Sequence, residues 1–440
     1  MGMVERRELS NHEKNVLESM PDHRSISDPL KTAFVSGGLF EFRKYVLGKN
    51  HDTSDKHKRI AILLRGNNNR IILYKYNHKI SELSAREIQG KVICTVKFDF
   101  NHARYTDDWY KKWCTLENLG FSIGESKTAE YLPQELTEKA TNGLIAKKLI
   151  KVTRNKHSVV NGGEIGTISC SRERFDDKFV EKCLGIFEEL VEDFFASATM
   201  DYFREAVSLK YPEAKNISGN AASVFVEKRW QQRLLFHFNN LQDGYYAYDL
   251  EFAQKFPDKD FVDKLARKLE NDEYKKVKAA DIKAALGTNE PDMLAIRYEG
   301  GNPKALVLIE VKSTEIACMG DSSVEKHMQG MAEYAKQSIF ISKRVTDAYE
   351  SLKQYKEMGI IESGVEIKGL PENPPVEKVL LLTNSNISIN ECGSTKPSAL
   401  DYYKQNKQSI KKWSDEYKCD VWITESNYFD NDIKIQPATY

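Results

Sequence analysis

The fold of this chain is constrained most by two apolar segments in its second half, residues 293–298 and 305–311. The six residues between them are Glu299-Gly300-Gly301-Asn302-Pro303-Lys304, whose Gly, Asn and Pro content is typical of a turn. Two apolar strands on either side of such a turn predict a β-hairpin. Any fold of this region has to include that hairpin.

Further segments of the same half alternate between helix and strand patterns. Helices are predicted at residues 222–238, 323–358 and 400–417, and strands at 246–252, 379–382 and 421–424. Residues 257–287 are charged and helical in character, as in an insertion. Because strands alternate with helices, we expect residues 220–440 to form an α/β domain with a mixed, partly parallel sheet flanked by helices.

The first half has a different pattern and predicts a separate α+β domain over residues 31–174, with a sensor or recognition role. Its predicted strands are 60–64, 71–76, 92–100 and 165–170, of which the first two flank a turn at Gly66-Asn67-Asn68-Asn69. Helices are predicted at 109–119 and 135–150. Residues 1–30 are polar, and we expect them to be flexible.

A strong amphipathic helix begins near Phe175. Apolar residues recur along it at spacings of four and three, which places on one face Phe179, Cys183, Phe187, Leu190 and Phe194. The acids on its other face are typical of a solvated helix surface rather than a metal site. Residues 211–220 are the expected linker, so residues 175–219 are predicted to connect the two domains.

Composition excludes several classes of protein. Hydrophobic residues make up 40% of the chain and charged residues 30%, which indicates a globular protein. No stretch reaches the roughly 20 apolar residues of a membrane span, and residues 1–15 lack the apolar core of a secretory signal. The seven cysteines are scattered without a C-x-x-C pair, so neither a disulfide framework nor a zinc site is predicted. We therefore expect a cytoplasmic protein.

The chain has no net charge, but its two parts differ in sign. Residues 1–174 contain 30 Lys and Arg against 21 Asp and Glu, a balance of +9. Because the whole chain has 65 of each, residues 175–440 have a balance of −9. A basic region can attract polyanions such as nucleic acid. The same excess is equally compatible with an ordinary solvated surface.

The predicted hairpin carries three charged residues where its apolar pattern would not place them. Asp292 opens the first strand, and the hairpin can bring it close to the end of the second. There Glu310 and Lys312 lie two residues apart, so their side chains share one face. Two buried carboxylates are costly unless something neutralises them, and a divalent cation does so. A surface ion pair on an edge strand is the alternative.

This arrangement predicts a metal-dependent hydrolytic site. We expect Asp292 and Glu310 to hold Mg²⁺, for which Mn²⁺ can substitute, with the backbone carbonyl of Val311 as a further oxygen ligand. Such a metal lowers the pKa of a bound water and offsets charge on a phosphate under attack. Lys312 would orient or deprotonate that water, and its ammonium would offset negative charge in the transition state.

The sequence also resembles a known family in this region. Pro291-Asp292, seventeen intervening residues and then Glu310-Val311-Lys312 resemble the signature of the PD-(D/E)XK nuclease superfamily. The resemblance covers about residues 221–430, where the predicted elements follow the family's order of helix, three strands, helix and strand. It implies a Mg²⁺-dependent endonuclease that acts on DNA, since the family includes restriction endonucleases and phage-defence effectors.

The resemblance implies two further site residues. The family often has an acid on the helix before the first strand, which corresponds to Glu227. Many members also have a glutamine on the helix after the E-x-K strand, which corresponds to Gln329. The run Glu227-Lys228-Arg229-Trp230-Gln231 also resembles the Shedu type of antiphage nuclease.

Two classes of function fit these observations. The first is an endodeoxyribonuclease that acts in restriction or antiphage defence, a biological role that rests on the family alone. The second is a nucleic-acid- or protein-binding module that keeps the fold without cleaving. The complete set of Asp292, Glu310 and Lys312 favours the nuclease, since a decayed site usually lacks one of them. Because one metal centre cuts one strand at a time, we also expect a homo-oligomer, either a dimer or a tetramer.

Overall fold

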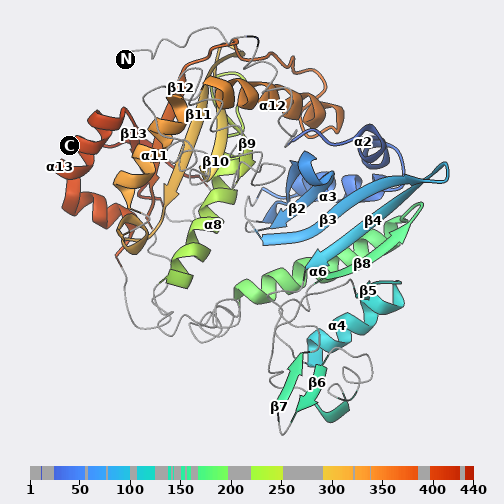
Figure 1. Ribbon diagram of the computed structural model, residues 1–440. Helices are drawn as coiled ribbons and strands as arrows, with labels where there is room; N and C mark the ends of the chain where they lie inside the picture. The colour runs from blue at the N-terminus through green and yellow to red at the C-terminus, as the bar shows by residue number, and fades with distance from the viewer. Residues whose placement is uncertain are drawn as a thin grey trace. The chain divides into compact units, whose positions relative to one another are not determined.

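The computed structural model describes residues 11, 24–54, 58–75, 78–99, 107–123, 137–139, 142, 150–153, 156–159, 167–196, 220–250, 291–320, 323–336, 338–384, 397–426 and 432–440. Contacts divide the chain into two compact units. The N-terminal unit comprises Ile26–Ala222, and the C-terminal unit comprises Met1–Ser25 together with Ser223–Tyr440 (Figure 1). Each unit contains a six-stranded sheet with helices packed on it.

The N-terminal unit is built on an antiparallel sheet. Its strand order is β1 (Ala61–Arg65), β2 (Arg70–Lys75), β3 (His78–Ile88), β4 (Lys91–Asp99), β8 (Thr167–Arg172) and β5 (Ser122–Ile123). A separate pair is formed by β6 (Ile150–Thr153) and β7 (Lys156–Val159). The longer helices are α2 (Asp28–Val35), α3 (Phe40–Asp52), α4 (Asp107–Asn118) and α6 (Asp177–Ala196).

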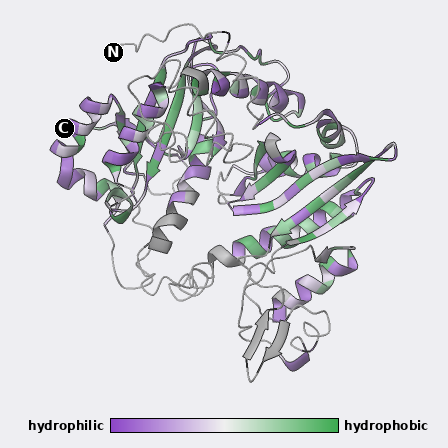
Figure 2. Ribbon diagram, viewed as in Figure 1, coloured by the Kyte–Doolittle hydropathy of each residue, from purple (hydrophilic) through white to green (hydrophobic). Residues whose placement is uncertain are grey.

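Helix α6 packs against the sheet through the apolar stripe that the sequence predicts. Phe179, Cys183 and Phe187 are buried, and the Phe187 ring stacks on Phe98 of β4 with 4.1 Å between ring centroids. Figure 2 shows hydrophobic and hydrophilic residues alternating along this helix. Because α6 contacts β3 and α3, it belongs to the N-terminal unit rather than to the connecting segment predicted from the sequence.

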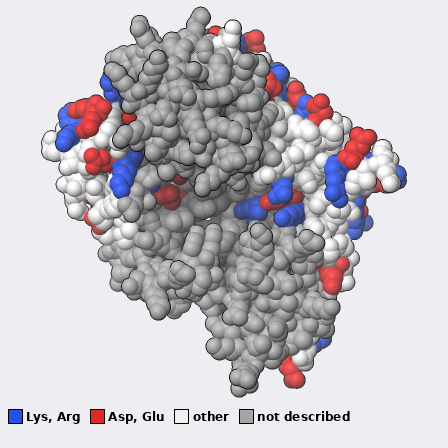
Figure 3. Space-filling model, viewed as in Figure 1, with Lys and Arg blue, Asp and Glu red and all other residues white. Residues whose placement is uncertain are grey.

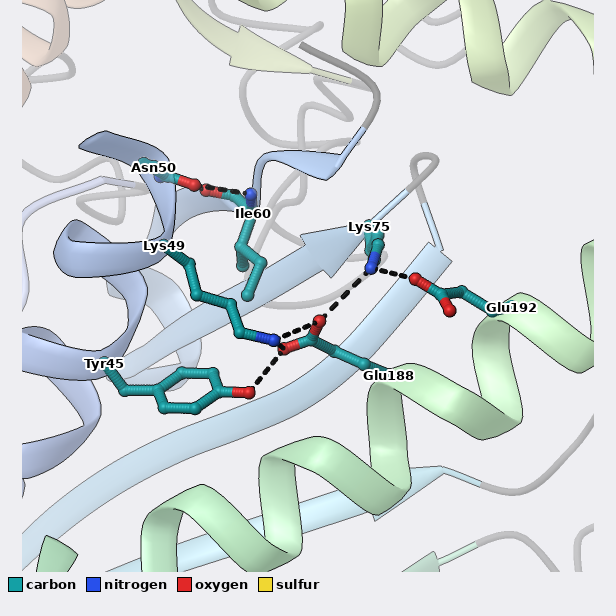
Figure 4. Close-up of polar contacts among 7 residues, drawn as sticks. All are labelled: Tyr45, Lys49, Asn50, Ile60, Lys75, Glu188 and Glu192. Carbon is teal, nitrogen blue, oxygen red and sulfur yellow. Dashed lines mark hydrogen bonds and ion pairs between the residues drawn. The ribbon is translucent and has the colours of Figure 1, made fainter. Parts of the chain in front are cut away.

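A partly buried ion cluster ties α6 to its neighbours (Figure 4). The Glu188 carboxylate, 7% exposed, accepts hydrogen bonds from Tyr45 Oη at 2.9 Å and from Lys49 Nζ at 3.0 Å. Lys75 of β2 lies 3.1 Å from the same carboxylate and also contacts Glu192, one turn further along α6. Burial and the charge of Glu188 raise the pKa of Tyr45, so the phenol keeps its proton and donates. We call these five side chains the Glu188 cluster.

The C-terminal unit contains a mixed sheet. Its strand order is β14 (Gln436–Pro437), β13 (Asp420–Ile423), β12 (Val376–Leu382), β11 (Asn302–Lys312), β10 (Met293–Glu299) and β9 (Gly244–Leu250). Strands β11, β12 and β13 run parallel, and the other neighbours are antiparallel. The longer helices are α8 (Asn220–His237), α11 (Val324–Lys336), α12 (Ser338–Glu357) and α13 (Ala399–Tyr417) (Figure 1). The predicted mixed, partly parallel sheet with helices is confirmed.

The predicted hairpin is formed by β10 and β11, and β11 lies between β10 and β12. Glu299 pairs with Asn302, so that Gly300 and Gly301 alone form the turn. Both glycines have positive φ, +56° and +70°, as a type I′ turn requires, and glycine adopts this conformation without the strain of a Cβ. From Ala305 onwards β11 is buried along its whole length, and Figure 2 shows its hydrophobic character.

Several segments differ from the predictions. The single helix predicted over residues 323–358 consists of two helices, α11 and α12. Strand β3 was not predicted because polar residues such as Ser81 and Glu82 interrupt its apolar pattern, and pairing with both β2 and β4 holds it in the sheet. The predictions for residues 211–219, 257–287 and most of 135–150 lie outside the described residues.

The expected flexible segment of residues 1–30 is structured at its end. Helix α2 begins at Asp28, and Leu30 is fully buried. Arg24 lies within the C-terminal unit, where its guanidinium forms a buried ion pair with Asp249 of β9. A residue near the start of the chain therefore contributes to a unit formed mainly by residues 223–440.

The surface shows no dominant sign of charge on the face drawn in Figure 3, where the described Lys and Arg side chains lie interspersed with Asp and Glu. None of the described helices has the length and apolar character needed to cross a membrane. Six cysteines fall in the described part of the chain, and all six are free thiols.

Candidate active site

The β10–β11 hairpin brings the three charged residues predicted from the sequence to one end of the sheet. Asp292 lies directly before β10, and Glu310 and Lys312 lie at the end of β11. Because Met293 pairs with Ile309, continuing the register places Asp292 beside Glu310. Asp292 Oδ2 accepts a hydrogen bond of 2.7 Å from the backbone N–H of Val311.

Glu310 receives two donors on a single oxygen. Lys312 Nζ lies 2.6 Å from Glu310 Oε1, and His327 Nδ1 of α11 lies 2.8 Å from the same atom. The side chains of Glu310 and Lys312 are 3% and 5% exposed, whereas His327 is 26% exposed. The carboxylate is therefore shielded from bulk water, while the imidazole beside it is partly open to solvent.

Helix α8 supplies a further donor to the site. Gln231, which is buried, donates from Nε2 to Asp292 Oδ1 at 2.8 Å. The preceding residue, Trp230, is fully buried, and the Arg233 guanidinium carbon lies 5.8 Å from its ring centroid. Burial of Trp230 fixes this turn of α8, so each oxygen of Asp292 is oriented by a different element.

The acidic and basic groups of the site shift one another's pKa values by different amounts and in different directions. Burial and the charges of Glu310 and Glu227 raise the pKa of Asp292 well above its ordinary value. Burial also acts to raise the pKa of Glu310, but Lys312 and His327 outweigh it and hold that pKa below the ordinary value. The neighbouring carboxylates raise the pKa of Lys312 despite its burial. Three carboxylates thus share one lysine, and their negative charge exceeds what Lys312 offsets.

The other residues predicted for the site are Glu227, Gln329 and Val311, and only some of them lie beside the carboxylates. Glu227 is close enough for its charge to raise the pKa of both Asp292 and Lys312, so α8 does bring it to the site. Gln329 is exposed on α11, and the structure records no hydrogen bond from it to the site carboxylates. Val311 donates its backbone N–H to Asp292. The role of its backbone carbonyl as a metal ligand stays a prediction.

Two residues that contact the site carboxylates, His327 and Gln231, were not predicted from the sequence. His327 lies on the same helix as Gln329 but two residues earlier, so the two side chains point to different sides of α11. Gln231 belongs to the same run as Glu227 and Trp230, but its contact with Asp292 was not predicted. The helical period could have shown that Glu227 and Gln231, four residues apart, lie on one face.

The carboxylate oxygens of the site suit a hard cation that takes only some of its ligands from the protein. Among the described residues, no three His, Cys, Asp or Glu side chains form a ready metal-binding group. Mg²⁺ typically binds through one or two carboxylates and completes its shell with water and phosphate oxygens. The raised pKa of Asp292 fits such an ion, because a divalent cation would relieve its repulsion with Glu310 and Glu227.

Comparisons with models of protein families, with curated proteins and with solved structures find no match to this chain. The function of this chain is therefore inferred from its own residues and from the geometry of the site.

Proposed function

We propose that this protein is a Mg²⁺-dependent endonuclease that hydrolyses phosphodiester bonds of DNA. The observation that carries the proposal is the pair of carboxylates, Asp292 and Glu310, held with Lys312 at one end of a buried hairpin. Surface ion pairs are an unsatisfactory alternative, because Glu310 and Lys312 are almost fully buried on a strand with neighbours on both sides. The resemblance to PD-(D/E)XK nucleases supports the same reading.

Asp292 and Glu310 are the residues that would hold the metal, with the Val311 carbonyl as a further oxygen ligand. When bound, Mg²⁺ would supply a water of lowered pKa and a positive charge opposite the phosphate under attack. Gln231 and the Val311 N–H orient the Asp292 carboxylate before any ligand arrives. Preorganisation of this kind means that little reorganisation is needed during reaction.

Lys312 is best suited to orienting the attacking water and offsetting phosphate charge. Its raised pKa means that it keeps its proton beside Glu310, so deprotonation of water by Lys312 is disfavoured in this arrangement. The ammonium donates to Glu310 Oε1 at 2.6 Å and has further protons to direct at a nucleophile or phosphate oxygen. The negative charge of Glu227 also acts to raise the pKa of Lys312, which strengthens retention of that proton.

Within the described part of the N-terminal unit there is a groove where a polyanion could bind. Lys111 and Lys112 of α4 and Lys182 of α6 line a groove of about 380 Å³, together with Glu181 and Glu189. Nucleic-acid binding through such lysines would weaken steeply as salt rises. A sensor or recognition role for this unit, a homo-oligomeric assembly and a place in restriction or antiphage defence complete the proposal.

The decisive experiment is a plasmid-nicking assay in Mg²⁺, with EDTA as the metal-free control. We expect Asp292→Asn and Glu310→Gln to abolish nicking, while Glu366→Gln, which alters a carboxylate that is 79% exposed in the same unit, keeps it. Parallel reactions on double-stranded DNA, single-stranded DNA and RNA identify the substrate. Nicking by both site variants at the wild-type rate would overturn the proposal.

A non-cleaving binding module is the rival function. It predicts that the wild-type protein binds nucleic acid or protein without cutting any of the three substrates. Cation-independent binding with no nicking in Mg²⁺ or Mn²⁺ would favour that rival.

A further inference from the structure

His327 was not among the residues predicted from the sequence, yet among the described residues it is the one helical side chain recorded as a hydrogen-bond or ion-pair partner of Glu310. Its Nδ1 atom lies 2.8 Å from Glu310 Oε1. Since the carboxylate can only accept, the imidazole donates from Nδ1 and carries a proton there. Helix α11 therefore contributes a donor to a carboxylate that belongs to β11.

A second donor, Lys312, reaches the same oxygen of Glu310 and helps to fix the orientation of the carboxylate. Lys312 Nζ reaches the same Oε1 atom at 2.6 Å. Two donors on one oxygen fix the rotation of the carboxylate, and within the described residues no hydrogen bond to Oε2 is recorded. Oε2 is thus the oxygen of Glu310 that is left to face a cation.

We infer that His327 is a positioning residue that orients Glu310 for metal binding, an inference that rests on the proposed function of the site. Residues that hydrogen-bond a metal ligand fix its orientation, and their loss typically weakens metal affinity by about 10- to 100-fold. Lys312 alone would fix the orientation of the carboxylate less well, because its ammonium lies at the end of a flexible chain and can donate any of its three protons. The planar imidazole on a packed helix restricts the carboxylate more tightly.

The position of His327 on α11 suits this role. Met328 and Met331 on the same helix are fully buried, so packing fixes the helix against the sheet. His327 itself is 26% exposed and contributes little to the apolar core. Its replacement is therefore expected to alter the site more than the stability of the unit.

The test measures Mn²⁺ affinity by calorimetry on the full chain, together with thermal stability and Mg²⁺-dependent nicking. We expect His327→Ala to weaken Mn²⁺ binding by about tenfold with little change in melting temperature. His327→Asn should restore most of the affinity, because its side-chain amide N–H lies where Nδ1–H lies. His327→Gln should not, because its amide reaches the position of Nε2 instead.

Glu333→Ala is the matched control, since it truncates a half-exposed side chain of the same helix that pairs with Lys336. Its Mn²⁺ affinity should equal that of the wild type. The inference is overturned if His327→Ala binds Mn²⁺ as tightly as the wild type, if Asn and Gln behave alike, or if the wild type binds no Mn²⁺.

Failure of the inference and failure of the proposed function give different results. If Glu310→Gln abolishes nicking and Mn²⁺ binding while His327→Ala changes neither, only the role of His327 is lost. If Glu310→Gln still nicks DNA at the wild-type rate, the proposed function itself fails.

Discussion

Asp292 is bound to the backbone of Val311, whose N–H donates to its Oδ2 atom at 2.7 Å. A backbone donor at this position is supplied by the strand itself, so the carboxylate is held at the end of β11 independently of the side chain at 311. The same hydrogen bond acts to lower the pKa of Asp292, but burial and the neighbouring carboxylates outweigh it. The site therefore holds Asp292 in place while leaving its charge unfavourable without a cation.

This conflict predicts that Asp292→Asn stabilises the metal-free protein at neutral pH. A raised pKa means that the folded state binds the proton more tightly than the unfolded state, so wild-type stability falls as pH rises above about 4. Asparagine does not titrate and avoids this loss. Calorimetric melting in EDTA should show a higher melting temperature for the variant at pH 7 and no difference near pH 3. A lower melting temperature at pH 7 would contradict the charge balance described for the site.

Lys312→Met should separate chemistry from metal binding. The change removes the ammonium that offsets phosphate charge, and loss of one such electrostatic contact typically costs about 10²–10³-fold in rate. Glu310 keeps its hydrogen bond from His327, so we expect Mn²⁺ binding to remain measurable by calorimetry. Lys312→Arg should recover little activity, since the wider guanidinium does not reproduce the 2.6 Å contact with Glu310. Loss of all Mn²⁺ binding in Lys312→Met would show that the lysine is needed to hold Glu310 as a ligand.

Glu188→Gln should destabilise the N-terminal unit. Glu188 is the shared acceptor of Tyr45, Lys49 and Lys75, so the variant leaves positive charge without its partner (Figure 4). Breaking a buried ion pair costs about 3–5 kcal/mol, and we expect the lower end because Lys75 keeps Glu192. Urea unfolding followed by tryptophan fluorescence measures this loss. Glu189→Gln is the control: Glu189 is 61% exposed and has only a surface pair with Lys112, so its change should be under about 1 kcal/mol.

Glu82 is expected to make the stability of the same unit depend on pH in acidic solution. Burial acts to raise its pKa, but Lys79 and Arg70 outweigh burial and lower it. A lowered pKa stabilises the fold above the unfolded value of about 4.3, and this contribution is lost as pH falls through the folded pKa. Glu82→Gln should therefore cost about 1–3 kcal/mol at pH 7 and progressively less below pH 4. Glu87→Gln, an exposed change on the same strand, is the control and should change stability by under about 0.5 kcal/mol.

The hairpin and its charges were predictable because their signals are local. Apolar segments, a glycine turn and a spacing of two between Glu310 and Lys312 need no knowledge of the rest of the chain. The contacts of His327 and Gln231 depend on how α11 and α8 pack against the sheet, which no short-range pattern specifies. Strand β3 was missed for the same reason: its buried Glu82 is compensated by Arg70 and Lys79, and only the folded sheet brings Arg70 across to it.

The ion pair between Arg24 and Asp249 has a consequence for how the protein is made. The two residues are 225 positions apart, and the whole N-terminal unit lies between them in the chain. At about 5–20 residues per second, a ribosome needs roughly 10–45 s to travel from one to the other. During that interval the N-terminal unit can fold while Arg24 waits for its partner, and Asp292, Glu310 and Lys312 have not yet been synthesised. The residues of the proposed active site are therefore synthesised only after the whole N-terminal unit, which can fold before the site exists.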